Sequence, residues 1–305
     1  MTTILTKLLM LLALLLSFFM NGNAQLLYKI SGNGLTKSSY IIGTYHLAPV
    51  SFVDSIPGLK EALDASEQVY GELDMTDLTS PENIQKVQAS MMLPEGTTIS
   101  SLLTAEEMER LNAVLKELMG MDMTNPLVKQ QLDGLTPMVL QTQLTLLIYM
   151  KKHAGFNPQA PFDGYFQQVA QQQGKAVGGL ETLDFQMKIL YNGQPLERQK
   201  ELLMCLVDDK EHMELMAEQL VKAFFAQDLE GMKAVMDEKQ QTRCDSSPEE
   251  EYQIIYNRNA NWAVLMPDIM AAKPTLFAVG AGHLPGEKGV LKLLQNAGFI
   301  IEGVK

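Results

Sequence analysis

Histidine, cysteine and tryptophan are scarce in this chain, whose 305 residues include four histidines, two cysteines and one tryptophan. Three familiar catalytic patterns are missing altogether. The sequence has no glycine-rich phosphate-binding loop, no Gly-x-Ser-x-Gly nucleophile elbow and no His-Glu-x-x-His helix. Neither cysteine stands in a motif that marks a nucleophile. The sequence therefore gives no support to these kinds of site, and any histidine chemistry depends on very few positions.

Basic residues are also few. The 24 lysines and arginines are outnumbered by 36 aspartates and glutamates, which gives a net charge of -12. This surplus of negative charge repels the phosphates of nucleic acids and the headgroups of anionic membranes, so we expect neither as a partner. The same surplus is compatible with cation binding but does not demonstrate it.

A long apolar run is present only near the N-terminus. Lys7 is the only charged residue before Lys29, an apolar stretch covers residues 8–20, and small residues at 22–24 form a cleavage site. This pattern predicts that residues 1–24 are a secretory signal peptide. An uncleaved N-terminal anchor is the alternative, although the apolar run is too short for a good membrane span.

The expected mature chain, residues 25–305, has no later segment long and apolar enough to cross a bilayer. Its first cysteine is Cys205, far from the cleavage site, which argues against a lipid anchor. We therefore expect a periplasmic or secreted protein without stable membrane insertion after signal cleavage. Export makes a disulfide between Cys205 and Cys244 chemically possible, but spacing alone does not fix its geometry. The sequence leaves that pairing and the oligomeric state open.

Short apolar runs bounded by turn residues predict strands, and helical periodicity dominates the middle of the chain. The expected strands are Leu26–Ile30, Ser39–Gly43, Gln68–Leu73, Ala176–Glu181, Thr275–Val279 and Phe299–Val304. The expected helices are Ile56–Glu67, Thr104–Met119, Thr136–Lys152, Pro161–Gln173, Pro195–Asp228, Leu229–Gln241, Pro248–Met270 and Gly289–Ala297. These elements predict a mixed α/β (α+β) fold with central sheet strands and a large, mostly helical middle region. No low-complexity linker divides residues 25–305, which favours one domain.

Two of the four histidines stand in the same unusual context, a Gly-x-x-His motif directly after a strand-like run. The motifs begin at Gly43 and Gly280 and end at His46 and His283, and Gly282 adds a second glycine to the later one. Glycine lets the backbone take a positive φ angle or approach a ligand closely. Because open α/β sheets bind ligands beyond the carboxyl ends of their strands, we expect both histidines to lie in one site.

These motifs and several others make the chain resemble the TraB/GumN family, which also includes PrgY and the animal Tiki proteins. The resemblance covers nearly the whole expected mature chain, and its joint order and spacing are more specific than any single piece. It is carried by Ile41-Ile42-Gly43-Thr44-Tyr45-His46, Gly71-Glu72-Leu73-Asp74, Phe162-Asp163-Gly164, the run from Gly174 to Thr182, Arg258-Asn259-Ala260-Asn261-Trp262, and the run from Val279 to Gly286.

The resemblance implies a fold related to the erythromycin-esterase and ChaN-like proteins. It also implies a metal-dependent hydrolase site, because Tiki proteins act as divalent-metal peptidases. Fold relatives include a haem-binding protein, so the fold alone does not decide the function. The positions carried over are His46, Glu72, Arg258, Asn259 and His283, with the glycines Gly43 and Gly280.

Two imidazoles and a carboxylate form a plausible set of ligands for a divalent metal such as Mn, Co or Zn. In this interpretation His46 and His283 bind the metal, and Glu72 is the third ligand or the general base. The alternatives are ordinary ones. Each histidine can satisfy a turn by bonding to backbone, and Glu72 can be a solvated strand end. Glycine-flanked His283 is expected to have little packing to lose if it is replaced.

Three further polar residues are expected near this site. Arg258 is assigned to a developing oxyanion or a substrate carboxylate, with an ion pair to Glu251 on its own helix as the alternative. Asn259 is assigned to hydrogen bonding or to orienting a ligand. Glu181 follows another predicted strand and is expected to cap the next helix or support the site from behind rather than act in catalysis.

The sequence favours an exported, metal-dependent hydrolase of peptidase type, acting on a peptide or small-molecule substrate. A non-catalytic periplasmic protein that binds a metal, a haem-like ligand or a peptide with the same histidines is the alternative. The twenty methionines suit either an adaptable peptide groove or, more commonly, an irregular helical core. His153 and His212 are expected to be solvated surface residues.

Overall fold

The structure is a computed structural model that describes residues 25–153 and 161–305, so the predicted signal peptide lies outside the described residues. Its centre is one mixed sheet of six strands in the order β4-β3-β5-β2-β1-β6. The strands are β1 (Leu27–Gly32), β2 (Ser39–Thr44), β3 (Gln68–Gly71), β4 (Ala176–Gly179), β5 (Thr275–Gly280) and β6 (Phe299–Gly303). Each of the six predicted strands is present. The mixed α/β fold is therefore confirmed.

Helices make up most of the remainder. They are α2 (Leu59–Ala65), α3 (Pro81–Ser90), α4 (Ile99–Leu102), α5 (Ala105–Met119), α6 (Pro126–Leu132), α7 (Pro137–Lys152), α8 (Phe162–Gln172), α9 (Leu183–Tyr191), α10 (Leu196–Asp208), α11 (Lys210–Phe225), α12 (Leu229–Asp237), α13 (Pro248–Glu251), α14 (Asn257–Ala272) and α15 (Val290–Asn296). Short 3-10 turns are η1 (Val50–Ser55), η2 (Asp77–Thr79) and η4 (Ala281–His283), and η3 (Tyr252–Tyr256) is a π-helical turn.

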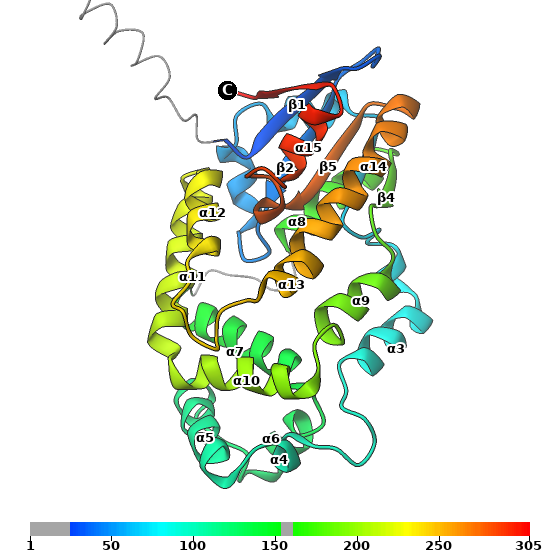
Figure 1. The fold of residues 1–305 in the computed structure, drawn as a ribbon. Coiled ribbons are helices and arrows are strands. Elements are labelled where there is room, and N and C mark those ends of the chain that lie inside the picture. The colour runs from blue at the N-terminus through cyan, green and yellow to red at the C-terminus, as the bar shows by residue number, and fades with distance from the viewer. Residues whose placement is uncertain (1–24, 154–160) are drawn as a thin grey trace, which may run out of the picture.

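The sheet is covered on both faces (Figure 1). Helices α14 and α15 lie on one face, and α8 packs on the other against β3, β4 and β5. Strands β4, β3, β5 and β2 run parallel, while β1 pairs antiparallel with both β2 and β6. Buried side chains from the two faces form one core that includes Phe166, Trp262 and Phe277. Parallel strands covered on both faces explain the continuous apolar runs in the sequence.

A second core lies in the helical middle of the chain. It is built from buried aliphatic residues of α5, α6, α7 and α10, among them Leu115, Leu144 and Leu203. Figure 1 shows these helices below the sheet, with α11 and α12 rising toward it. The mostly helical region therefore has apolar packing of its own and lies on the side where the parallel strands end.

Local signals set most helix boundaries. Thr104 and Glu107 form a capping box at the start of α5, and Pro137 occupies the first turn of α7 after the cap residue Thr136. One prediction was wrong. The single helix expected over Pro195–Asp228 is broken at Asp209, whose extended φ of -135° ends α10 and whose carboxylate caps α11.

Four helices in the middle, α3, α4, α6 and α9, were not predicted from the sequence. The structure joins Cys205 and Cys244 in a disulfide, with Cα atoms 5.7 Å apart, which confirms that they lie close enough to pair. Across the two described ranges, none of the helices combines the length and the apolarity that a membrane span requires.

Candidate functional site

The two Gly-x-x-His motifs lie side by side at one edge of the sheet. Strands β2 and β5 are parallel neighbours, with Gly43 opposite Val279 and Thr44 opposite Gly280. A β-carbon on Gly43 would come within 3.0 Å of the Ala281 side chain, so glycine at this position lets the two motifs pack closely against each other. Close approach, not a positive φ angle, is what the motif glycines provide, because Gly43 and Gly280 are both absent from the residues with positive φ.

His283 is buried and held in one orientation. Its Nδ1 lies 2.6 Å from Oδ1 of Asn259, and Nδ2 of Asn259 donates to the carbonyl of Lys288 at 2.9 Å. That second bond fixes the amide so that its oxygen faces the imidazole, and Nδ1 of His283 must therefore carry the proton. Burial lowers the pKa of His283 to about 4, and the nearby Arg258 charge acts in the same direction. The ring is neutral at pH 7, with its lone pair on Nε2.

Arg258 joins this imidazole to two carboxylates. Its Nη1 lies 3.2 Å from Nε2 of His283, and its Nη2 donates to Glu72 at 2.6 Å. Nε and Nη2 also bind the two oxygens of Glu181 at 2.8 Å and 2.9 Å. The Arg258 side chain is only 4% exposed, so this ion-pair network is enclosed by protein. Arg258 is thus a structural hub beside Nε2 of His283.

The turn before α14 explains how two adjacent residues both reach the site. Arg258 and Asn259 directly follow the π-helical turn η3 and are 3% and 0% exposed. Nη1 of Arg258 also donates to the Ile254 carbonyl in that turn at 3.2 Å. A π turn inserts one residue into the helical repeat and re-aims the side chains that follow it, and such turns are frequent at functional sites.

Glu72 follows β3 and lies between the second motif and Arg258. Its Oε1 accepts a hydrogen bond from the Gly280 backbone N–H at 2.8 Å and lies 3.9 Å from Nε2 of His283. Burial alone would raise the pKa of this carboxyl. The charge of His283 in its protonated form, the Arg258 charge and the Gly280 N–H together outweigh burial and hold the pKa of Glu72 below its usual range. Glu72 is therefore ionised at neutral pH.

His46, the last residue of the first Gly-x-x-His motif, lies at the same end of the sheet. Its Nδ1 lies 2.5 Å from Oδ2 of Asp163 in the first turn of α8, and Thr44 donates its hydroxyl to the other oxygen of that carboxylate. The hydrogen bond to Asp163 raises the pKa of His46 to about 9. In contrast to His283, the His46 side chain is 76% exposed. Its ring stands at the solvent side of the site, within electrostatic reach of Glu72, Arg258 and His283.

Glu181 lies behind the site, and the expected helix-capping role is wrong. Thr182 caps α9, whereas the Glu181 carboxylate is bound by Arg258 and by the Trp262 indole N–H at 3.0 Å. The alternative pairing of Arg258 with Glu251 is also wrong, because Glu251 pairs with Lys239. The third motif glycine, Gly282, faces the Met236 thioether, which a β-carbon would meet at 2.9 Å.

The sequence reasoning gave no role to three residues that shape the site. Asp163 orients His46, Trp262 holds Glu181, and Gln186 donates to both Glu72 and Glu181 at 3.2 Å and 3.4 Å. Asp163 and Trp262 both belong to motifs that carry the family resemblance, so the sequence did mark these two positions. Their partners His46 and Glu181 lie 117 and 81 positions away, and a local sequence pattern does not predict contacts over such separations.

The donor types at this edge fit a divalent metal. Both histidines have Nδ1 bound to an oxygen of a neighbour, which is the outer-shell arrangement that leaves Nε2 free for a metal. Glu72 adds an ionised carboxylate. In the described residues, however, no three side chains of His, Cys, Asp or Glu converge closely enough to hold a metal ion as they stand. The Arg258 guanidinium fills the space next to Nε2 of His283 and must shift for that nitrogen to bind one.

A family model matches residues 26–303, nearly the full described length. The chain belongs to the TraB/PrgY/gumN family. The match spans both Gly-x-x-His motifs, Glu72 and the Arg-Asn pair that the structure gathers at the end of the sheet. The matched range therefore contains all the residues that form the candidate site.

The chain is similar to several animal proteins named as metalloproteases. The chain is 26% identical over 309 residues to Metalloprotease TIKI2 of Danio rerio, 23% over 319 residues to Metalloprotease TIKI homolog of Nematostella vectensis, and 25% over 300 residues to Metalloprotease TIKI1 of Xenopus tropicalis. These alignments cover 86–88% of this chain but 58–65% of the relatives, so it spans about three-fifths of their length. No solved structure matches the chain significantly.

Proposed function

We propose that this protein is an exported, metal-dependent hydrolase of peptidase type that acts on a peptide or small-molecule substrate. One observation carries the proposal: two histidines from separate motifs flank an ionised glutamate, and each has its Nδ1 fixed by an oxygen acceptor. This arrangement is typical of metal-binding histidines. The names of the TIKI relatives support the same chemistry, and the signal-peptide pattern at residues 1–24 supports export to the periplasm or the medium.

The proposed ligands are His46, His283 and Glu72, and a divalent metal such as Mn, Co or Zn bound there would polarise a carbonyl and make water nucleophilic at neutral pH. Asn259 and Asp163 keep the two imidazoles in the tautomer whose Nε2 can bind. His46 must give up its second proton first, because its hydrogen bond to Asp163 favours the charged ring.

Arg258 has two jobs in this proposal. Its Nη1 donates to the lone pair of His283 Nε2, so that hydrogen bond would have to break for the nitrogen to act as a ligand. After such a shift the guanidinium would remain next to its partners Glu72 and Glu181. A fixed positive charge at that place stabilises the negative charge that develops on a carbonyl oxygen during hydrolysis. Glu72, which is ionised, serves as the third ligand or accepts the proton of the attacking water at its carboxylate.

The test uses His46→Ala, because its side chain is 76% exposed and its loss removes little packing. Metal-free protein is loaded with Mn, Co or Zn in turn, and bound metal and cleavage of a mixed peptide library are measured. We expect about a tenfold or greater loss of metal affinity and loss of cleavage, while the metal-free protein stays folded and loses only the stability that the His46–Asp163 ion pair supplies. The matched control is His212→Ala, which removes a histidine on α11.

His283→Ala is a weaker test than the sequence suggests. The ring is 6% exposed, bonds to Asn259 and lies 4.5 Å from the Trp262 ring, so its removal costs about 1–3 kcal/mol of stability. The expectation that this residue has little packing to lose is wrong. If His46→Ala retains metal and cleavage, the proposed site is wrong. If wild-type protein binds metal but cleaves no peptide, the proposed reaction is wrong.

A further inference from the structure

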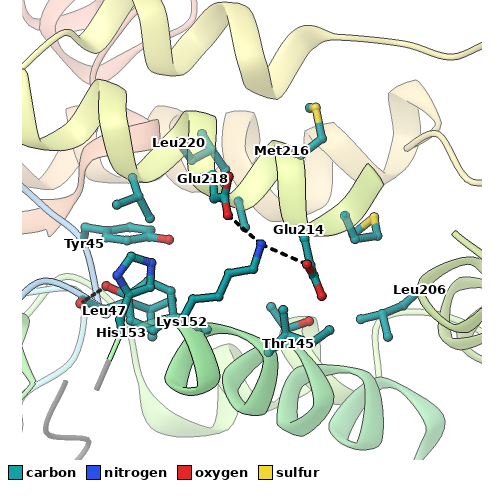
Figure 2. Close-up of a pocket in the computed structure, with 15 residues that line it drawn as sticks. Tyr45, Leu47, Thr145, Lys152, His153, Leu206, Glu214, Met216, Glu218 and Leu220 are labelled. Atoms are coloured by element: carbon teal, nitrogen blue, oxygen red, sulfur yellow. Dashed lines mark hydrogen bonds and ion pairs between the residues drawn. The ribbon is translucent and has the colours of Figure 1, made fainter. Parts of the chain in front are cut away.

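A cavity of about 210 Å³ opens beside the first Gly-x-x-His motif, between that loop and the helical middle of the chain. Its walls come from the loop after β2 and from α7, α10 and α11 (Figure 2). The apolar part of the lining is formed by Ile148, Leu206, Met213, Met216, Leu220 and Val221. We infer that this cavity is a specificity subsite for one bulky, uncharged, apolar side chain of a peptide substrate. The inference rests on the proposed function and adds the substrate class.

The position of the cavity relative to His46 supports this assignment. Tyr45 and Leu47, the residues on either side of His46, both line the cavity. The Tyr149 hydroxyl on α7 donates to the Leu47 carbonyl at 2.9 Å and ties the motif loop to the wall of the cavity. Since His46 stands between these two lining residues in the chain, the cavity opens next to the loop that carries His46.

Size favours a large side chain. A cavity of about 150 Å³ with aliphatic and aromatic walls accepts a benzene molecule, so about 210 Å³ accommodates the side chain of Phe, Leu or Met. Met213 and Met216 supply flexible thioether walls that can adjust to side chains of different shape. This places two of the chain's many methionines at a binding surface.

The ion pairs around the cavity disfavour the binding of acidic and basic side chains in it. Lys152 is the cation of the lining, and its Nζ lies 2.9 Å from Glu214 and 2.5 Å from Glu218 on α11. Figure 2 shows Lys152 reaching from α7 to both carboxylates. Glu214 also pairs with Lys210 at 2.9 Å, so the ionic groups around the cavity neutralise each other. A charged side chain entering it would lose hydration without gaining an unpaired partner.

The binding test does not depend on catalysis. The probes are N-acetyl-4-fluorophenylalanine amide, followed by fluorine NMR, and N-acetyl-aspartate amide as its competitor. Ala217, which lines the cavity on α11, is replaced in Ala217→Phe to fill it. The control is Ala113→Phe at an exposed position of α5. We expect wild type to bind the aromatic probe about tenfold more tightly than the acidic one, and Ala217→Phe to lose about tenfold in affinity while the control keeps it.

A second variant keeps the test independent of how well Ala217→Phe folds. Replacing both acids, Glu214→Gln with Glu218→Gln, leaves Lys152 without the carboxylates that neutralise it. This variant should gain about tenfold in affinity for the acidic probe. Absence of that gain, or equal binding of both probes by wild type, overturns the subsite.

A peptide-cleavage assay is the second test of the subsite. Peptides that differ at one position, Phe, Leu or Met against Asp or Lys, are offered to metal-loaded wild type and to Ala217→Phe. We expect the apolar peptides to be preferred by wild type and their KM to rise about tenfold in Ala217→Phe. Cleavage without preference overturns the subsite while the hydrolase proposal stands. Binding of the aromatic probe without any cleavage supports the subsite and counts against the hydrolase.

Discussion

At the scale of single residues, the two histidines of the site differ in what surrounds them. His283 is enclosed and neutral, whereas His46 faces solvent and is paired with the Asp163 carboxylate. One motif thus gives two kinds of imidazole, because the residue that binds Nδ1 is an amide in one case and an acid in the other. In the proposed site, release of a proton from His46 would therefore set the pH range in which a metal can bind.

Asp163→Asn tests this pairing. The carboxylate stabilises the His46 imidazolium, so its loss should lower the pKa of His46 toward the ordinary 6.5. Because the ring is 76% exposed and water screens the pair, we expect a wild-type pKa between 6.5 and about 9. NMR titration of the imidazole in metal-free protein measures the change. Asp184→Asn, at the first turn of α9, is the control and should leave the value unchanged.

Arg258 should be essential to the stability of its ion-pair network. Arg258→Met leaves Glu72 and Glu181 buried without their cation, which costs about 3–5 kcal/mol. The folded-state pKa of Glu72 would then lie above its unfolded value, so the folded state binds more protons there and the variant regains stability as the pH falls. Urea unfolding between pH 7 and pH 5 measures this.

Two control variants test the interpretation of the stability loss in Arg258→Met. Arg110→Met removes an arginine that is 39% exposed and should cost no more than about 1 kcal/mol. Adding Glu181→Gln to Arg258→Met should cost less than the sum of the single changes, since the amide no longer needs a cation. Strict additivity would show that Arg258 and Glu181 are not coupled.

Sequence reasoning reached part of this site, for reasons visible in particular residues. His46 and His283 could be paired because each follows a strand, and neighbouring parallel strands end at one edge. Asn259 was expected to hydrogen-bond or to orient a ligand, but the pairing of His46 with Asp163 could not be predicted, because a hydrogen-bond partner far along the chain depends on packing. Glu181 was expected to cap a helix or to support the site from behind, and its contact with Arg258, which is not local, fits only the second role.

At the scale of elements, the sequence pattern predicted the strands but not the breaks between helices. The strands are short apolar runs, five of the six end at glycine, and all six were recognisable from the sequence. The break at Asp209 between α10 and α11 lies within a stretch predicted as one helix, and both helices contact α7. The π turn before Arg258 has no sequence signature, although it re-aims two site residues.

The disulfide should stabilise the connection between α10 and the segment before α13. Closing a loop across 39 positions contributes about 4 kcal/mol in the chain-entropy account. Arg198 on α10 also holds this segment through the Arg243 and Asp245 carbonyls and Glu250. We therefore expect Cys205→Ala with Cys244→Ala to lose about 2–4 kcal/mol in urea unfolding. Reductant should lower wild-type stability to that of the variant, and a larger loss in wild type would point to another cause.

At the scale of the whole molecule, the two cores contribute different parts of the proposed function. The sheet brings together the residues of the candidate site at one edge. The helical middle supplies α7, α10 and α11, which form most of the cavity beside His46. The sequence predicted this region as helical but could not place its cavity, because a cavity exists only between helices whose packing is known.

The two histidines also give the metal-free protein a predictable dependence of stability on pH. His283 has a folded pKa of about 4, below the 6.5 of the unfolded chain, so it stabilises the fold above pH 6.5 and the gain is lost as pH falls toward 4. A difference of that size corresponds to about 3 kcal/mol. His46 has a raised folded pKa, so its contribution is complete below pH 6.5 and is lost as pH rises toward 9.

Stability of the metal-free wild type should therefore be highest near neutral pH and fall on both sides. His283→Ala should flatten the acid side between pH 6.5 and pH 4, because the proton taken up on unfolding is no longer available. His46→Ala should flatten the alkaline side and leave the acid side as it is. Urea unfolding in chelator at closely spaced pH values measures both slopes. If the acid slope is the same in His283→Ala as in wild type, buried neutral His283 is not its source, and the carboxylates Glu72 and Asp163, whose folded pKa values are lowered, would account for it.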